Sequence, residues 1–273
     1  MLRRLEELSN LIGVSGDEGR VRRYIKAELA DIDGLDMKTD AMGNLIVHKA
    51  GKGPKVMVAA HMDEVGMIVI GALDSGLIAY GQRGIDSRVV VSKRVLVGDE
   101  MIEGVIGAKA IHLQTAADRK TVLGHSELFV DIGAKDKDDA LKYVKPGDRI
   151  GFATKFKRLG EKRVMGKALD DRVGCAILMQ LLANDYECDF YGVFTVQEEV
   201  GLRGMHAAAY SVAPDVVIVL EGTTANDMPE VKNVGFVTKM SHGPAISFMD
   251  NATIVSPDMF KALTETANAA GIK

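Results

Sequence analysis

The chain has 273 residues, and its 47% hydrophobic and 26% charged side chains are typical of a folded globular protein. Its formal net charge of −4 argues against a basic surface for nucleic acid or an anionic membrane. No apolar run in the sequence reaches the roughly 18 residues of a membrane span. The N-terminus lacks the apolar stretch of a signal peptide, so we expect a cytoplasmic protein.

The two cysteines, Cys175 and Cys188, do not form a CxxC pair. This spacing argues against a cysteine zinc site and against a disulfide framework. Aromatic residues make up 5% of the chain, and there is no Trp. This composition argues against a stacking platform for bases or sugars.

The first part of the chain alternates between helical and extended patterns. Leucines at helical spacing predict a helix in residues 2–12, and apolar residues predict another in 21–29. Residues 15–18, Ser-Gly-Asp-Glu, offer an N-cap and early acidic charge for that second helix. Two strands follow, over residues 44–48 and 56–60.

The middle of the chain, from about residue 67 to 156, consists of short β runs separated by Gly, Asp and Lys, with one helical stretch over 137–143. Closely spaced short strands predict a small β-barrel-like domain. From residue 168 helical and extended patterns alternate again, which predicts an α/β sheet. These later elements are expected over about 171–183 (helix), 190–196, 215–220, 233–239 and 245–248 (strands), and 256–270 (helix).

Together these patterns predict an α/β fold with a mixed central sheet flanked by helices and an inserted small β-barrel-like domain. We place the α/β domain in residues 1–66 and 162–273, and the inserted β domain in residues 67–161.

Metal-capable side chains gather where predicted strands end. Ligand sites of open α/β sheets lie outside the carboxyl ends of the strands. A further pair, Asp170-Asp171, precedes a predicted helix. The side chains that follow strands are His61, Asp63, Glu198, Glu199 and Glu221.

Each of these features also has a structural interpretation. A lone histidine is more often part of a core, Glu198-Glu199 could be solvated surface charge, and Asp170-Asp171 could cap a helix. Taken together they favour a site for divalent ions, because imidazole and carboxylate suit Zn²⁺, Co²⁺ or Mn²⁺. Clustered carboxylates repel one another unless cations compensate them, and a bridged pair of ions does so. His242 precedes a turn and is a weaker candidate for substrate contact.

Four segments carry a resemblance to the M42 family of aminopeptidases. They are AAHMDEVG at 59–66, KALDDRVG at 167–174, VQEEVG at 196–201 and LEG at 220–222. The resemblance implies His61 and Glu221 on one metal, Glu199 on the other, and Asp170 as the bridge between the two. It also implies Glu198 as the general base, Asp63 as the residue that orients His61, and a cis Asp170–Asp171 peptide bond.

The sequence departs from the family pattern at two places. Many relatives carry Asp at the position of Glu221, which has the same ligating group on a longer arm. The family's second metal also takes a final His from a C-terminal segment, and no residue before Lys273 matches it. The resemblance therefore implies two divalent ions per subunit, with Zn or Co preferred over Mn. It also implies that the second of the two metal sites is incomplete in this chain.

The sequence thus predicts a metal-dependent aminopeptidase that hydrolyses N-terminal residues from peptides, with Glu198 as general base. Two alternatives stay open: hydrolysis of another amide, such as an N-acyl amino acid, on the same metal core, or a non-catalytic scaffold subunit. A glycosidase is disfavoured, because a two-carboxylate glycosidase needs no His61. The resemblance also implies a homo-oligomer, with the inserted domain as a contact surface.

Overall fold

The computed structural model describes residues 1–225, 227, 238–250 and 253–272 of the chain. The chain divides into two compact units, Met1–Gly222 and Thr223–Lys273, which are described separately. The domain boundaries at residues 66/67 and 161/162 stay a prediction.

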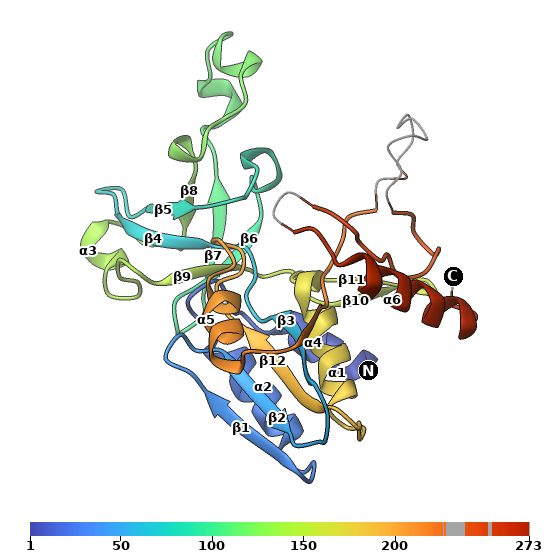
Figure 1. Cartoon of the computed structure of the whole chain (residues 1–273). Coiled ribbons are helices and arrows are strands. Elements are labelled where there is room, and N and C mark those ends of the chain that lie inside the picture. The colour runs from blue at the N-terminus through green and yellow to red at the C-terminus, as the bar shows by residue number, and fades with distance from the viewer. Residues whose placement is uncertain (226, 228–237, 251–252, 273) are drawn as a thin grey trace. The chain divides into compact units, whose positions relative to one another are not determined.

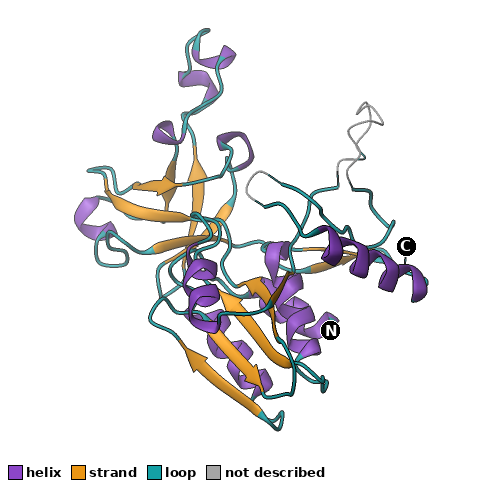
Figure 2. Cartoon of the chain, in the orientation of Figure 1, coloured by secondary structure: helices purple, strands orange, loops and turns teal. Residues whose placement is uncertain are grey.

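The first unit contains a five-stranded mixed sheet (Figures 1 and 2). β3 runs parallel to both of its neighbours, β12 and β13, whereas β2 is antiparallel to β1 and β12. The mixed α/β sheet predicted from the sequence is therefore confirmed. Across the sheet the order is β1 (Leu35–Thr39), β2 (Leu45–Lys49), β12 (Asp189–Thr195), β3 (Lys55–His61) and β13 (Val216–Val219).

Helices pack on both faces of this sheet because successive side chains of a strand point to opposite faces. In β3, Val58 and Ala60 join a core cluster with residues of α1, α2 and α4. The alternate residues Met57 and Ala59 join a second cluster with Ala208 of α5. The helices are α1 (Leu2–Asn10), α2 (Gly19–Leu29), α4 (Leu169–Leu181) and α5 (Arg203–Val212).

Between β3 and α4 the chain forms a closed barrel, in the strand order β4-β5-β8-β7-β6-β9 (Figure 1). Its interior holds its own apolar cluster, which includes Val69, Val95 and Ile150. The inserted barrel predicted from the short β runs is confirmed. Its strands are β4 (Met67–Ala72), β5 (Ile78–Gln82), β6 (Arg94–Val97), β7 (Ile102–Gly107), β8 (Phe129–Asp131) and β9 (Arg149–Phe152).

Short elements complete the first unit. β10 (Lys157–Leu159) and β11 (Arg163–Met165) form a two-stranded antiparallel sheet. The predicted helix over 137–143 is shorter, and α3 covers Lys137–Ala140. Four 3-10 turns lie in the barrel region: η1 (Ser87–Val89), η2 (Ile111–Leu113), η3 (Asp118–Lys120) and η4 (His125–Glu127).

The second unit contains α6 (Pro257–Ala269), which matches the last predicted helix. The strand expected over 245–248 is wrong: Phe248 is 67% exposed, and the described residues nearby form only an isolated bridge between Met249 and Ile254. Most of the strand expected at 233–239 lies outside the described residues.

Within the described part of the chain, no helix combines the length and the apolar composition that crossing a membrane requires. The cytoplasmic location stays a prediction.

Candidate metal centre

The candidate site lies at the carboxyl edge of the five-stranded sheet. The parallel register places Thr195, the last residue of β12, opposite His61, the last residue of β3. β13 runs in the same direction and ends at Val219, two residues before Glu221. Parallel pairing therefore brings three segments that are distant in sequence to one edge, each followed by a metal-capable side chain.

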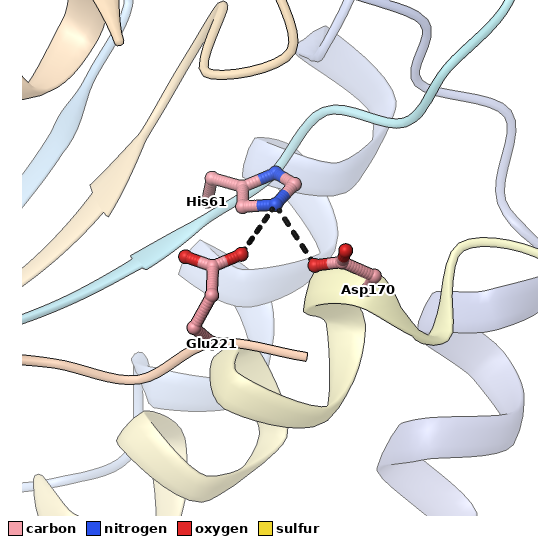
Figure 3. A group of neighbouring side chains, drawn as sticks. All are labelled: His61, Asp170 and Glu221. Carbon is pink, nitrogen blue, oxygen red and sulfur yellow. Dashed lines mark hydrogen bonds and ion pairs between the residues drawn. The ribbon is translucent and has the colours of Figure 1, made fainter. Parts of the chain in front are cut away.

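One edge of the His61 ring faces two carboxylates, those of Asp170 and Glu221 (Figure 3). Its Nε2 atom is 3.2 Å from Oδ1 of Asp170 and 3.3 Å from Oε1 of Glu221. Asp170 comes from the start of α4, and Glu221 from the segment after β13. The imidazole itself is almost fully buried, at 2% exposure, while the two carboxylates are more open. These three side chains offer one nitrogen and two oxygens around a single point, as a divalent ion requires.

A second group shares the same imidazole. Glu198 and Glu199 follow β12, and one ligating atom of each lies within 4.8 Å of the others and of His61. The Oε2 atom of Glu198 is 4.0 Å from Nε2 of His61. Four carboxylates named from the sequence are thus brought together around the buried His61, namely Asp170, Glu198, Glu199 and Glu221.

Asp63 lies behind this group, fully buried. Its carbonyl oxygen is 3.1 Å from Nδ1 of His61, and its carboxylate Oδ1 is 3.4 Å from the same atom. The hydroxyl of Ser15 donates to Oδ2 of Asp63 at 2.6 Å. Contact with the second imidazole nitrogen fixes the ring orientation and leaves Nε2 directed at the carboxylates.

The start of α4 departs from regular helix. The Asp170–Asp171 peptide bond is cis, and both residues have non-helical backbone angles. The buried carboxylate of Asp171 accepts from the backbone N–H groups of His61 (3.2 Å) and Gly174 (3.0 Å), so it points away from Asp170. A Cβ atom at Gly222 would lie 2.9 Å from the Cβ of Asp170, and only glycine allows this close approach.

Crowded negative charge shifts the pKa values of the side chains at this site. Burial opposes the charged form of His61, but contacts with Asp170, Asp63 and Glu221 raise its pKa well above the ordinary value. Burial, reinforced by Glu198, raises the pKa of Glu199 to about 7. Among the described residues, the ion pairs of Asp170, Glu198 and Glu221 are all with His61. A protonated imidazole therefore supplies positive charge that a bound cation would otherwise bring.

The donor set suits a divalent metal of borderline or hard character. Imidazole and carboxylate groups are present, and the buried thiol of Cys175 contacts the carbonyl oxygen of His61 instead of joining the cluster. His242 belongs to the second unit, where its Nδ1 atom is 2.9 Å from the carbonyl of Met240.

Sequence reasoning missed three side chains that support the site, namely Ser15, Glu18 and Asn44. Ser15 and Glu18 lie in the segment expected to cap the second helix. In the structure, the residue preceding α2 makes no side-chain cap, and the hydroxyl of Ser15 contacts Asp63 instead. No local pattern could have found these contacts, because the partners are 48 or more residues apart.

Known proteins that resemble this chain are aminopeptidases and peptidases. A putative aminopeptidase of Acetivibrio thermocellus is 38% identical over 98% of this chain and 79% of that protein. A TET aminopeptidase structure from a marine sediment archaeon (Thaumarchaeota) superposes with a TM-score of 0.95 at 32% identity, covering 99% of this chain and 79% of that one. The TET1 peptidase of Pyrococcus horikoshii, described as assembling into a tetrahedron or a large octahedral shell, superposes with a TM-score of 0.87 at 33% identity, over 99% and 82% of the two chains.

A family model also matches most of the sequence. The model of M42 glutamyl aminopeptidases matches residues 43–273, which include every candidate ligand. The chain therefore belongs to the M42 family of aminopeptidases.

Proposed function

We propose that this chain is a metal-dependent aminopeptidase that removes N-terminal residues from peptides. The observation that carries the proposal is the gathering of four carboxylates, those of Asp170, Glu198, Glu199 and Glu221, around the buried imidazole of His61. Four carboxylates offer more oxygen donors than one ion needs, and this arrangement suits two neighbouring cations.

The protein ligands divide between two positions. His61 and Glu221 would hold one divalent ion, Glu199 would hold the other, and Asp170 would bridge both. Zn²⁺ or Co²⁺ suits this mixture of nitrogen and oxygen donors best, and Mn²⁺ is also compatible. When bound, such ions lower the pKa of a water molecule and polarise the carbonyl group of the scissile bond.

Glu198 is suited to move the proton. Its carboxylate is partly buried at the edge of the ligand group, and burial raises its pKa towards neutrality. As general base it accepts a proton from the attacking water, whose oxygen adds to the carbonyl carbon. When the C–N bond breaks, Glu198 returns the proton to the leaving amine. Asp63 keeps the imidazole of His61 in place throughout.

The test of this assignment is Glu198→Gln, which keeps the size of the side chain but cannot accept the proton. We expect kcat on aminoacyl-p-nitroanilides to fall about 10²–10⁴-fold, the usual scale for loss of a general base. Metal content, measured after dialysis, should stay at the wild-type level. Near wild-type kcat in this variant would assign the base elsewhere.

A substrate panel that includes N-acetyl amino acids separates an aminopeptidase from a hydrolase of other amides.

We also propose that the chain forms a homo-oligomer through the barrel. The barrel exposes Ile111, Leu113 and Val122, each more than 60% exposed, in the segment between β7 and β8. Apolar side chains grouped in one exposed segment favour a protein contact. Light scattering tests this: a monomer at micromolar concentration would contradict it, and Ile111→Lys with Leu113→Lys should dissociate the assembly.

A further inference from the structure

Four consecutive backbone N–H groups at the end of β12 donate to side-chain oxygens. This segment, residues 196–199, contains the proposed base and one proposed ligand. The four bonds are Val196 N to Asn44 Oδ1 (3.0 Å), Gln197 N to Glu18 Oε1 (3.1 Å), Glu198 N to Asp63 Oδ1 (2.9 Å) and Glu199 N to Asp63 Oδ2 (3.2 Å).

The three acceptors form what we name the acceptor cradle: Glu18, Asn44 and Asp63. All three are buried, with 4%, 0% and 0% exposure. β12 ends at Thr195, so the next N–H groups leave the hydrogen-bond ladder of the sheet. A buried N–H group needs a partner, and here side chains supply what the sheet no longer provides.

The acceptor cradle is itself held rigidly. The amide of Asn44 donates to Oδ2 of Asp40 at 2.7 Å and to the carbonyl of Gly204 at 2.9 Å. The Oε1 atom of Glu18 also accepts from the N–H of Gly16 at 2.7 Å. Each acceptor oxygen therefore has a fixed place before it meets residues 196–199.

The segment also needs this support. Gln197 has a φ angle of 54°, a left-handed conformation that side chains other than glycine rarely adopt. Such a conformation persists only where surrounding contacts determine it. The bond from Gln197 N to Glu18 acts on the residue whose backbone angles set the direction of the two glutamates that follow.

We propose that Glu18 and Asn44 are positioning residues that hold Glu198 and Glu199 at the metal centre through the backbone of residues 196–199. The proposal rests on the function proposed above for those two glutamates. Displacing a reacting group by about 1 Å can cost about 10²-fold in rate, so the cradle should affect catalysis although it touches no reacting atom.

Three substitutions at Glu18 separate positioning from simple packing. Glu18→Met fills a similar volume without an acceptor, Glu18→Asp withdraws the carboxylate by one methylene, and Glu18→Gln keeps an acceptor oxygen at the same reach. We expect kcat to fall about 10–100-fold in the Met and Asp variants, with KM changed less than about threefold, and Gln to restore most of the activity. Hydrogen–deuterium exchange at the backbone amides of residues 196–199 should accelerate at least about tenfold in Glu18→Met and Glu18→Asp, but not in Glu18→Gln.

A matched control comes from the opposite end of the sheet. Asp215 accepts the backbone N–H of Lys55 at 2.8 Å where β3 begins, so Asp215→Leu also removes a carboxylate acceptor of this sheet. Its kcat and its exchange at amides 196–199 should equal the wild-type values.

The outcomes distinguish the two proposals. Wild-type kcat and wild-type exchange in either Glu18→Met or Glu18→Asp would overturn the positioning role, even if Glu198→Gln is inactive. If Glu18→Met does not fold, Glu18→Asp decides alone. If the wild-type protein hydrolyses no peptide substrate, the proposed function fails, and the exchange rates still decide whether Glu18 holds the segment.

Discussion

Two clusters of charged side chains in the first unit contain the adjacent residues Asp63 and Glu64, and the two clusters are balanced in different ways. In one, the carboxylate of Glu64 accepts from Nζ of Lys167 at 2.8 and 2.9 Å, and Nη2 of Arg172 lies 3.7 Å away. In the other, the carboxylates around His61 have that imidazole as their cationic neighbour. Asp63 and Glu64 are adjacent residues, yet they serve opposite arrangements.

The difference between the two clusters shows how a carboxylate with a structural role differs from carboxylates with a proposed binding role. Glu64 is paired with cationic side chains of the same chain, and its carboxylate also accepts the N–H of Gly13 at 2.9 Å. The proposed metal centre has more carboxylates than cationic side chains around it, so binding of a divalent cation would relieve their mutual repulsion. The first cluster is balanced by side chains of the chain itself, whereas the second would be balanced by a bound ion.

The largest effect on stability is expected when the pairing of Glu64 with Lys167 is removed. Lys167→Met leaves a buried Glu64 with only the more distant Arg172, so we expect a loss of about 3–5 kcal/mol in the free energy of unfolding. Urea denaturation measures it. Lys49→Met is the control, because its partner Asp185 is 96% exposed and such a pair contributes less than about 1 kcal/mol. An equal loss in both variants would mean that Glu64 does not depend on Lys167.

A smaller effect on the free energy of unfolding is expected at the proposed metal centre, where a substitution should increase stability. Glu199 has a pKa of about 7 instead of 4.5, so its ionisation destabilises the metal-free fold. A raised carboxyl pKa means that stability is lost as the pH rises from about 4.5 through about 7. Glu199→Gln should therefore be more stable than the metal-free wild type by about 1–2 kcal/mol at pH 8, discounted for partial exposure, and by little at pH 4.

Added Zn²⁺ should sharpen this contrast. At 100 times its dissociation constant an ion stabilises the folded state by about 2.7 kcal/mol. The Gln variant lacks one of the proposed ligands, so it should gain less. Thermal unfolding with and without Zn²⁺ should show a larger gain for the wild type. If Glu199→Gln is less stable than the metal-free wild type at pH 8, repulsion between Glu199 and the neighbouring carboxylates does not destabilise the fold.

Much of this arrangement could be predicted from the sequence because its signals are local. His61 and Glu221 each follow a run of apolar residues that predicts a buried strand. Short β runs separated by turn residues predict the barrel. The carboxyl ends of parallel strands meet at one edge, so strand prediction alone gathers these side chains.

The acceptor cradle could not be predicted, because its contacts join segments that are distant in sequence. Glu18 and Gln197 are 179 positions apart, and Asn44 and Val196 are 152 apart. From the sequence, Glu18 is an acidic residue near the start of a helix, where negative charge is favourable. In the structure its carboxylate instead accepts a hydrogen bond from the distant residue Gln197. The strand expected at 245–248 failed for a related reason: an apolar run forms a strand only when a partner strand accepts its backbone groups.

The insertion of the barrel between β3 and β12 has a consequence for synthesis of the chain. All six barrel strands pair with one another within residues 67–152. In the described part of the chain β3 pairs with β12 and β13, which are synthesised more than 125 residues after it. As the chain leaves the ribosome, His61 therefore emerges long before Asp170, Glu198, Glu199 and Glu221, and the barrel strands all precede these four residues. Glu221 is the last of the side chains around His61 to be added, so this group cannot assemble until nearly all of the first unit has been synthesised.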